Sequence, residues 1–259
     1  MTDTPARDPF AVLRAATPAR VGLGRVGQGL PTAPMLAFQL AHARARDAVH
    51  AELDVDRVRS IISGETLVVH SAAANRAAYL LDPDLGRRLN TQSVALVRGN
   101  FDLVIVVADG LSATAVHAHA AAVVAGLIAR LPDWTLAPVV IARLGRVAIG
   151  DPIGAALGAR LAVVLIGERP GLSAADSLGA YITFDPKPGR RDSERNCVSN
   201  IREPGGLSPD QAVDKIAWLL TEARRLSFTG VDLKDREISI RLDDQAAIRA
   251  SQSFNTPST

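Results

Sequence analysis

Short runs of apolar residues alternate with amphipathic stretches from about residue 67 to residue 225. A continuous apolar run is typical of a strand that is buried on both faces of a sheet. The runs that predict strands are 67–70, 102–108, 136–142 and 161–166, with 181–184 as a further one. The stretches that predict helices are 73–80, 82–89, 112–130 and 151–159. Strands that alternate with helices indicate an α/β fold with a Rossmann-like open, mainly parallel sheet flanked by helices.

The C-terminal part of this pattern carries boundary signals. Ser208, Pro209 and Asp210 are typical of a helix start, and apolar positions recur from there to about residue 225. Residues 185–200 are rich in Pro, Arg and Asp and predict a long loop. Residues after about 234 predict a polar tail, which is expected to be disordered over 251–259.

The N-terminal residues predict a helical arm. Asp8-Pro9 opens a short helix, a glycine-rich loop covers 21–30, and Thr32 with Pro34 predicts the cap of a helix that ends near residue 53. This helix carries an apolar face and a polar flank that suits contact with another subunit. The face comprises Met35, Phe38, Ala41, Ala45 and Val49, and the flank Gln39, His42, Arg46 and His50. The chain thus divides into an arm (1–65), a Rossmann-like domain (66–235) and a polar tail (236–259).

Composition narrows the class of protein. Of the 259 residues, 47% are hydrophobic and only 4% aromatic, which suits an aliphatic core between helices and a parallel sheet. A formal net charge of +2 gives no basic stripe for nucleic acid. The single cysteine, Cys197, excludes an intrachain disulfide and any zinc cluster with two or more thiolates. No secretory signal and no uninterrupted apolar run of membrane-spanning length occurs, so we expect a soluble, intracellular protein.

Residues 22–27 match the dinucleotide-binding pattern G-x-G-x-x-G. That fingerprint must follow a buried strand and open a helix, whereas only Arg20 and Val21 precede it directly. Asp47, at the spacing of a ribose-binding acid, falls inside a predicted helix. The pattern therefore favours a flexible surface loop, and a stand-alone nicotinamide- or flavin-binding oxidoreductase remains an alternative.

Two predicted strands end in polar residues, at the edge where α/β sheets bind ligands. Asp109 and Ser112 suit either a ligand site or an ordinary turn into a capped helix. Glu168 suits either a hydrogen-bond acceptor in the crevice or a surface ion pair with Arg169. Cys197 lies in the predicted long loop, either as an activated thiol or as a packing residue.

The histidines do not suggest a metal site. His117 and His119 lie two residues apart on a predicted helix and therefore face different directions. His42 and His50 lie on the polar flank of the predicted arm helix. No Ser/His/Asp order, H-E-x-x-H or P-loop occurs. The residues alone thus indicate a ligand-binding α/β domain with a helical arm and no visible catalytic machinery.

Several motifs occur in the order of one known family. They are DPF at 8–10 with LR at 13–14, RVGLGR at 20–25, LPT at 30–32, FQLAHARARDAVH at 38–50, ADGLSA at 108–113, GERPGL at 167–172 and NCVSNI at 196–201. Over residues 8–234 the chain resembles the light (small) chain of ethanolamine ammonia-lyase, an adenosylcobalamin-dependent enzyme.

This resemblance implies a subunit of a carbon–nitrogen lyase that converts ethanolamine to acetaldehyde and ammonia by radical chemistry. In that family the heavy (large) chain, a TIM-type barrel, holds the substrate. The light chain covers the cobalamin, which lies between the two chains of a hetero-oligomer of heavy–light pairs. Carried over by position, the cofactor contacts fall on Val147, Glu168 and Cys197, with no catalytic residue and no metal ligand in this chain. Val147 would offer apolar or backbone contact, Glu168 would accept hydrogen bonds, and Cys197 would approach from the loop.

Two further expectations concern the cofactor and the cellular location. The motif D-x-H-x-x-G, whose histidine replaces the dimethylbenzimidazole on cobalt in another class of cobalamin domains, matches none of the five histidines, so we expect base-on cobalamin. Some relatives carry a longer leader that is associated with packaging in a bacterial microcompartment, whereas seven residues precede Asp8 here. We expect the cytoplasm, with a microcompartment as an open alternative. A non-catalytic interaction protein that shares the fold is the remaining alternative function.

Overall fold

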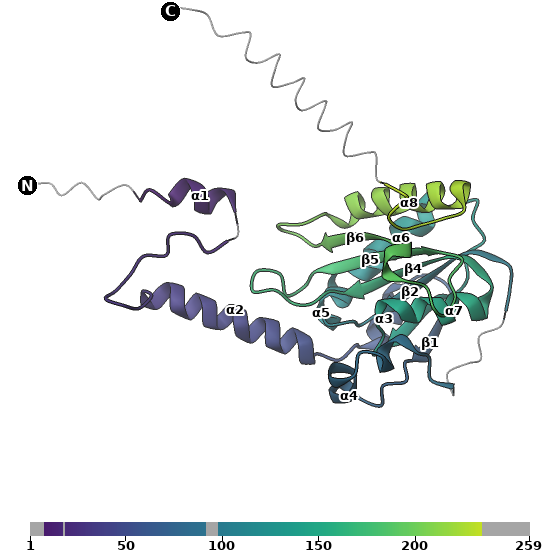
Figure 1. Cartoon of the computed structure of the whole chain (residues 1–259), viewed down its shortest axis with the longest axis horizontal. Helices are drawn as coiled ribbons and strands as arrows, with labels where there is room; N and C mark the ends of the chain where they lie inside the picture. The colour runs from purple at the N-terminus through teal and green to yellow at the C-terminus, as the bar shows by residue number, and fades with distance from the viewer. Residues whose placement is uncertain (1–7, 18, 92–97, 235–259) are drawn as a thin grey trace, which may run out of the picture.

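The fold is built on one six-stranded sheet with helices packed on its faces (Figure 1). The computed structural model describes residues 8–17, 19–91 and 98–234. The strands are β1 (Thr66–His70), β2 (Phe101–Ala108), β3 (Val139–Arg143), β4 (Ala159–Gly167), β5 (Leu178–Phe184) and β6 (Arg195–Ile201). The α-helices are α1 (Ala11–Ala16), α2 (Thr32–His50), α3 (Val55–Ile61), α4 (Arg76–Leu81), α5 (Ala113–Ala115), α6 (Ala121–Arg130), α7 (Gly150–Leu157) and α8 (Pro209–Leu226). The 3-10 turns are η1 (Leu85–Arg87), η4 (Val147–Ile149) and η5 (Asp192–Glu194), and η3 (Val116–Ala120) is a π-helical segment between α5 and α6.

The strands lie in the order β1-β3-β2-β4-β5-β6. Neighbours from β1 to β4 are parallel, whereas β5 is antiparallel to both β4 and β6. The ten residues 168–177 join β4 to β5 and contain no helix. A parallel pair needs a crossover of a dozen or more residues, usually helical, so this link turns the chain back. The predicted α/β class is confirmed, and the reversal at β5 makes the sheet mixed.

Strand β2 confirms the prediction of burial on both faces. Residues 103–108 have exposed fractions of 0–2%. Leu103 and Ile105 enter the core on the side of α6 and α8, here named the α8 face. Val104 and Val106 enter the core on the side of α7, here named the α7 face. This burial explains why the strand reads as a continuous apolar run.

The prediction of a long loop over 185–200 is wrong in its C-terminal part, because strand β6 begins at Arg195. Only Val198 and Ile201 of this strand enter the core of the α8 face. The pairing of β5 with β6 also shifts register between Leu178 and Ala180. An edge strand with one bare face and irregular pairing lacks the apolar alternation by which strands are recognised.

The N-terminal helices also begin differently from the prediction. The predicted cap at Thr32 is wrong, because Pro31 is the N-cap of α2 and no side chain caps this helix. Helix α3, which the sequence pattern does not separate from the arm, is capped by Asp54. Its Val58 is buried in the core of the α8 face. The division of the chain at residue 65 stays a prediction, and the predicted tail 236–259 lies outside the described residues.

Helix α8 and the helical stretch Ala113–Arg130 cover the α8 face. Ser208 caps α8 in a capping box with Gln211, which confirms the predicted helix start. The stretch Ala113–Arg130 is long and apolar enough to cross a membrane by length and composition alone. It packs against α8, and Val123 and Leu127 are fully buried in the core, which accounts for its apolar composition.

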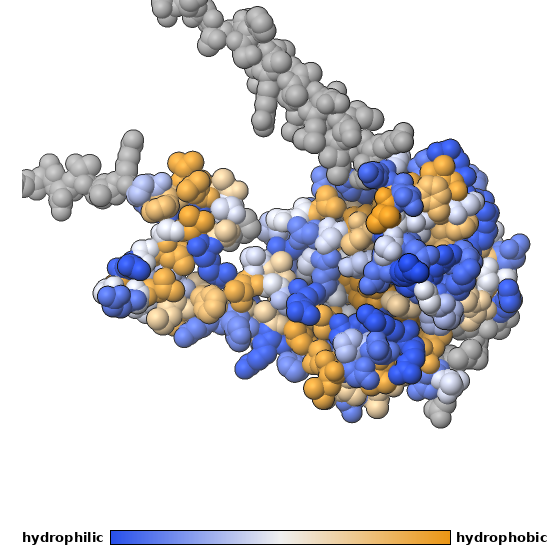
Figure 2. Space-filling view, viewed as in Figure 1, coloured by the Kyte–Doolittle hydropathy of each residue, from blue (hydrophilic) through white to orange (hydrophobic). Residues whose placement is uncertain are grey.

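Helices α1 and α2 extend away from the sheet (Figure 1). Ala48 is the one buried residue of α2, which has nineteen residues. Exposed apolar side chains gather on this part of the surface (Figure 2). They include Phe10, Leu13, Leu30, Met35, Leu36, Phe38 and Leu40. Between the two helices Gly22, Gly24 and Gly27 have positive φ in a loop that no described strand precedes, as predicted for residues 22–27.

Candidate functional site

The α7 face is covered by a hydrophobic core only as far as β4. In the described part of the chain, no fully buried apolar residue of β5 or β6 belongs to this core. Two cavities with volumes of about 290 and 420 Å³ lie there, and Arg146, Val147 and Tyr181 line both of them. Cys197 lines the first cavity and Glu168 the second. These five residues define a surface that we name the open strip, and the three residues carried over from the resemblance all lie on it.

Glu168 lies at the carboxyl end of β4, and its carboxylate is held by residues from other segments. Ser177 Oγ donates to Oε2 and Ser199 Oγ donates to Oε1, each at 2.6 Å. The N–H of Asn200 donates to Oε2 at 3.2 Å. A Cβ at Gly179 would lie 2.8 Å from Oε1, so glycine leaves the space for the carboxylate. A carboxylate offers about four acceptor directions, so one remains for a donor on a ligand.

The structure bears on the alternatives that the sequence left open for Glu168 and Asp109. Glu168 forms no ion pair with Arg169 in the described structure, and its oxygens accept from neutral donors. Asp109 is 3% exposed and accepts a hydrogen bond from the N–H of Gly145 at 3.0 Å. Burial raises the pKa of Asp109, and Arg76 opposes the change from 3.6 Å. Asp109 therefore anchors the turn after β2 to the turn after β3, as expected for a residue of an ordinary turn.

Tyr181 and Cys197 are cross-strand partners on β5 and β6. The pKa of the exposed Cys197 thiol is raised by desolvation, and a hydrogen bond from Tyr181 opposes the rise. Burial likewise raises the pKa of the Tyr181 hydroxyl. An activated cysteine needs a lowered pKa, so the surroundings of Cys197 favour a neutral thiol that acts as a packing residue. The thiol approaches from strand β6 and not from a loop, which corrects that part of the expectation.

Val147 begins η4, directly after Arg146. The guanidinium of Arg146 lies 4.3 Å from the ring centroid of Tyr79, and that of Arg76 lies 4.8 Å from the same ring. The Tyr79 hydroxyl donates to the carbonyl oxygen of Gly145 at 3.1 Å. This cluster fixes the segment that presents Val147 to both cavities.

A buried ion pair supports the open strip from below. The two terminal nitrogens of Arg195 donate to the two carboxylate oxygens of Asp151, each at 2.7 Å. Arg195 Nη1 also donates to Thr183 Oγ1 at 2.8 Å. The side chains of the pair are only 2% and 3% exposed. Asp151 belongs to α7, which directly follows the turn that holds Val147, and Arg195 belongs to β6, which contains Cys197, so the pair ties together the segments that position these two residues.

The histidines lie outside the lining of both cavities. His117 Nε2 accepts a hydrogen bond from the N–H of Asp54 at 2.9 Å, beside the start of α3. His119 Nε2 lies 3.9 Å from a carboxylate oxygen of Asp176. His42 and His50 lie on α2. Within the described ranges, no group of three or more His, Cys, Asp or Glu residues could hold a metal ion.

Sequence reasoning missed the aromatic and arginine residues of the site. The chain has only two tyrosines, and both belong to this region, since Tyr79 and Tyr181 each line the second cavity. Arg146 stacks on the ring of Tyr79, and Arg195 lies on strand β6, where it is buried beneath the strip. In a chain with so few aromatic residues, the tyrosines were the signal that could have directed attention here.

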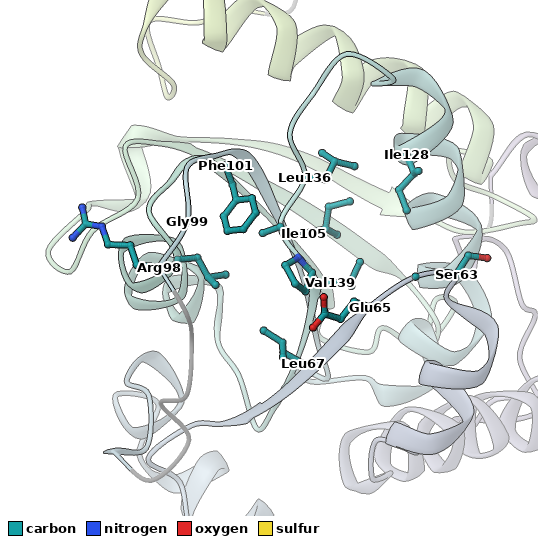
Figure 3. A pocket seen from close by; sticks show the side chains of 14 residues that line it. Ser63, Glu65, Leu67, Arg98, Gly99, Phe101, Ile105, Ile128, Leu136 and Val139 are labelled. Atoms are coloured by element: carbon teal, nitrogen blue, oxygen red, sulfur yellow. The ribbon is translucent and has the colours of Figure 1, made fainter.

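A cavity of about 590 Å³ lies at the opposite edge of the sheet (Figure 3). Glu65, Phe101 and Val139, at or next to the starts of β1, β2 and β3, contribute to its walls. Most of its other lining is hydrocarbon, and none of the predicted site residues lies there. The candidate site is therefore at the carboxyl edge, as in other α/β sheets.

Comparison with known proteins gives consistent matches. The family model of the ethanolamine ammonia-lyase light chain (EutC) matches residues 7–234. The ethanolamine ammonia-lyase small subunit of Xanthomonas campestris pv. campestris is 49% identical over an alignment of 267 positions, which covers 98% of each chain. The protein of the same name from Bradyrhizobium diazoefficiens is 56% identical over an alignment of 239 positions, which covers 88% of this chain and 91% of the relative.

Proposed function

Since the chain belongs to the ethanolamine ammonia-lyase light chain family, we propose that its open strip covers adenosylcobalamin in an enzyme whose large subunit holds the substrate. The chain is then the small subunit of a lyase that converts ethanolamine to acetaldehyde and ammonia. Family membership supports this function and not the stand-alone oxidoreductase. The glycine loop 22–27 agrees, because no described strand precedes it.

One observation carries the assignment of the site. Val147, Glu168 and Cys197 come from η4, from the link after β4 and from β6, and they line two cavities that share a wall. They lie 21 and 29 residues apart along the chain (168 − 147 and 197 − 168), so their convergence depends on the fold. The core of the α7 face does not extend over them.

The chemistry of the surface fits a corrinoid. A corrin is a broad ring with apolar faces and a rim of amides, and the strip offers Val147 and Tyr181 beside the carboxylate of Glu168. Pockets that enclose drug-sized ligands measure roughly 300–1,000 Å³, and the cavities of about 290 and 420 Å³ are too small to enclose the larger corrinoid. The ligand must therefore be shared with a second chain.

The bound cofactor supplies the radical with which cleavage of the substrate begins. The residues of this chain bind and shield it. Val147 and Tyr181 exclude water from one side, Glu168 accepts a hydrogen bond from a rim amide, and the neutral thiol of Cys197 packs against the ring. Among the described residues no histidine lines either cavity, so these residues would offer the cofactor no imidazole, and base-on cobalamin stays a prediction.

The large subunit is proposed to bind the exposed N-terminal helices as well as the open strip. Apolar side chains on α1 and α2 are 41–79% exposed, including Val12, Leu13, Met35 and Phe38. We propose that residues 1–65 act as a helical arm on a Rossmann-like domain, and that heavy–light pairs form a hetero-oligomer. We place the enzyme in the cytoplasm, and targeting of a fluorescent fusion would reveal packaging in a microcompartment.

The assignment is tested with the heavy–light complex and the variants Glu168→Gln and Glu168→Ala. A hydrogen bond to a charged group contributes about 1.5–3 kcal/mol, so the affinity for adenosylcobalamin should fall roughly 10- to 100-fold. Absorbance titration measures this without turnover. Asp214→Asn, which removes a carboxylate from α8, is the matched control and should bind as the unchanged complex does. Equal affinities for all four proteins would refute the site.

Cys197 provides a second readout because it is the only cysteine. Alkylation of its thiol should be suppressed when both the large subunit and cobalamin are present, and to a smaller extent by the large subunit alone. Unchanged alkylation in the loaded complex would place the cofactor elsewhere.

A further inference from the structure

Arg146 presents an uncompensated positive charge to the open strip. Its backbone N–H donates to the carbonyl oxygen of Gly86 at 2.8 Å, which holds the residue at the turn after β3. Its side chain lies against Tyr79 and borders both cavities. The guanidinium is thus at the centre of the surface and is not a mobile group at its margin.

The donors of Arg146 are largely unused. A guanidinium carries five N–H donors. Within the described structure, Nη2 donates to the carbonyl oxygen of Tyr79 over a long 3.4 Å, and Nε is buried without an acceptor. An unmade bond from a buried charged donor is costly, so the surroundings of Arg146 are incomplete until an acceptor reaches the guanidinium.

Arg76, on the same tyrosine ring, also has one buried nitrogen, Nη2, without an acceptor, but it differs from Arg146 in that its charge is paired. It lies 3.6 Å from Asp109, and it donates to the carbonyl oxygens of Val49 and Gly110, each at 2.8 Å. Arg146 forms no ion pair with a described residue. The cluster around Tyr79 therefore contains one guanidinium that is paired with a carboxylate and one that is free to bind an anion.

Neither of the two described acidic residues that line the cavities, Glu168 and Asp192, forms an ion pair with Arg146. Glu168 accepts from three donors of this chain, and Asp192 lies 3.6 Å from Arg195. Arg87, another cation of the first cavity, donates to Asp84 at 2.9 Å. The unpaired charge of Arg146 is consequently available to an anionic group that does not belong to this chain.

We propose that Arg146 binds the phosphodiester of the nucleotide tail of cobalamin. This inference rests on the proposed function and adds to it a residue that recognises one defined part of the cofactor. The amides on the corrin rim are neutral, whereas the phosphodiester carries a negative charge. A planar guanidinium binds phosphate oxygens through two parallel N–H donors, and the stacking on Tyr79 orients it in advance.

The test compares two corrinoids that undergo no turnover. Cyanocobalamin contains the phosphodiester, whereas dicyanocobinamide lacks the phosphodiester and the rest of the nucleotide. Binding of each probe to the heavy–light complex is measured by equilibrium dialysis. Arg146→Gln should weaken cyanocobalamin binding by about tenfold or more and change dicyanocobinamide binding by less than about twofold. Arg146→Lys, which keeps the charge but not the fork, should fall between these limits.

The controls distinguish recognition of the phosphodiester from a structural role of Arg146. Arg130→Gln removes the same charge from the α8 face and should leave both affinities unchanged. Equal weakening for both probes would overturn the proposal, because Arg146 would then contact the ring or only support the fold. Loss of complex assembly on gel filtration would also overturn it, in favour of a carboxylate of the large subunit. If the unchanged complex binds neither probe, the proposed function itself fails, whereas normal binding with an unresponsive Arg146 refutes this inference alone.

Discussion

The two faces of the sheet differ in how far their cores extend. On the α8 face the core includes Leu178 and Ile182 of β5 and Val198 and Ile201 of β6. On the α7 face the buried core ends at β4. Neighbouring residues of β5 illustrate the contrast, since Ile182 is fully buried whereas Tyr181 borders both cavities of the open strip.

With the proposed function, this contrast means that the same two strands contribute to stability on one side and to ligand recognition on the other. Apolar side chains buried between sheet and helix stabilise the fold. Tyr181 and Cys197, which leave that layer, are free to be selected for a ligand. The predictions below test how sharply stability and recognition separate between the faces.

The largest expected effect is on the ion pair that supports the open strip. Asp151→Ala leaves the buried Arg195 guanidinium without its carboxylate, and breaking such a pair costs about 3–5 kcal/mol. Urea unfolding of the purified chain measures the loss. The double variant Asp151→Leu with Arg195→Met removes both charges and should recover most of it. A change below about 1 kcal/mol for Asp151→Ala would mean that this pair does not hold the strip.

A second prediction compares adjacent residues of β5. Ile182→Ala creates a cavity in the α8-face core and should lower the free energy of unfolding by about 2–5 kcal/mol. Tyr181→Phe removes only a hydroxyl on the α7 face and should cost roughly 1 kcal/mol or less. The same urea titrations compare the two variants. Similar losses of free energy of unfolding in the two variants would contradict the difference in packing between the two faces.

A third prediction concerns the reactivity of the thiol on the open strip. Desolvation raises the pKa of Cys197, so less thiolate is present at pH 8 than in the unfolded chain. Alkylation by iodoacetamide should therefore be severalfold slower in the folded protein than in urea. Tyr181→Phe should slow it further, because the tyrosine hydroxyl stabilises the thiolate. Faster reaction in the folded protein would instead indicate an activated cysteine.

The smallest effect on the free energy of unfolding is expected from His117, in the helical stretch that covers the α8 face. Burial, assisted by Arg57, lowers the pKa of His117 from its usual value of 6.5, so the folded state binds this proton less readily than the unfolded state. The contribution to stability is then present above pH 6.5 and is lost as the pH falls through the lowered pKa. His117→Gln keeps an acceptor for the N–H of Asp54. It should flatten the decline of the free energy of unfolding below pH 6.5. His70, whose pKa is also lowered, accounts for a remaining slope.

Most of the parallel half of the sheet was predictable because β2, β3 and β4 are buried on both faces. Residues 103–108 and 161–166 predict β2 and β4 by unbroken apolar runs, and Ser208, Pro209 and Asp210 predict the start of α8. Both signals are local. Neither depends on knowing which distant residues pack against the element.

The antiparallel half and the site depend on contacts that are remote in sequence. Strand β6 shows no apolar alternation because one of its faces is open, and its buried Arg195 resembles a surface residue until Asp151 is placed beside it. Glu168 could be chosen as an acidic residue at a strand end. Its hydrogen bond from Ser199, however, requires that β5 and β6 fold back antiparallel beside β4. The stacking of Arg146 on Tyr79 likewise appears only once the segment after β3 meets α4.

The short link between β4 and β5 has an architectural consequence. Had β5 continued parallel to β4, its crossover would have laid a helix over one side of the sheet. The hairpin connection provides no such helix, and β5 and β6 therefore lack a crossover helix on that side of the sheet. A reversal of chain direction, and not the deletion of a helix, thereby leaves room on this side of the sheet for the ligand and the large subunit that we propose.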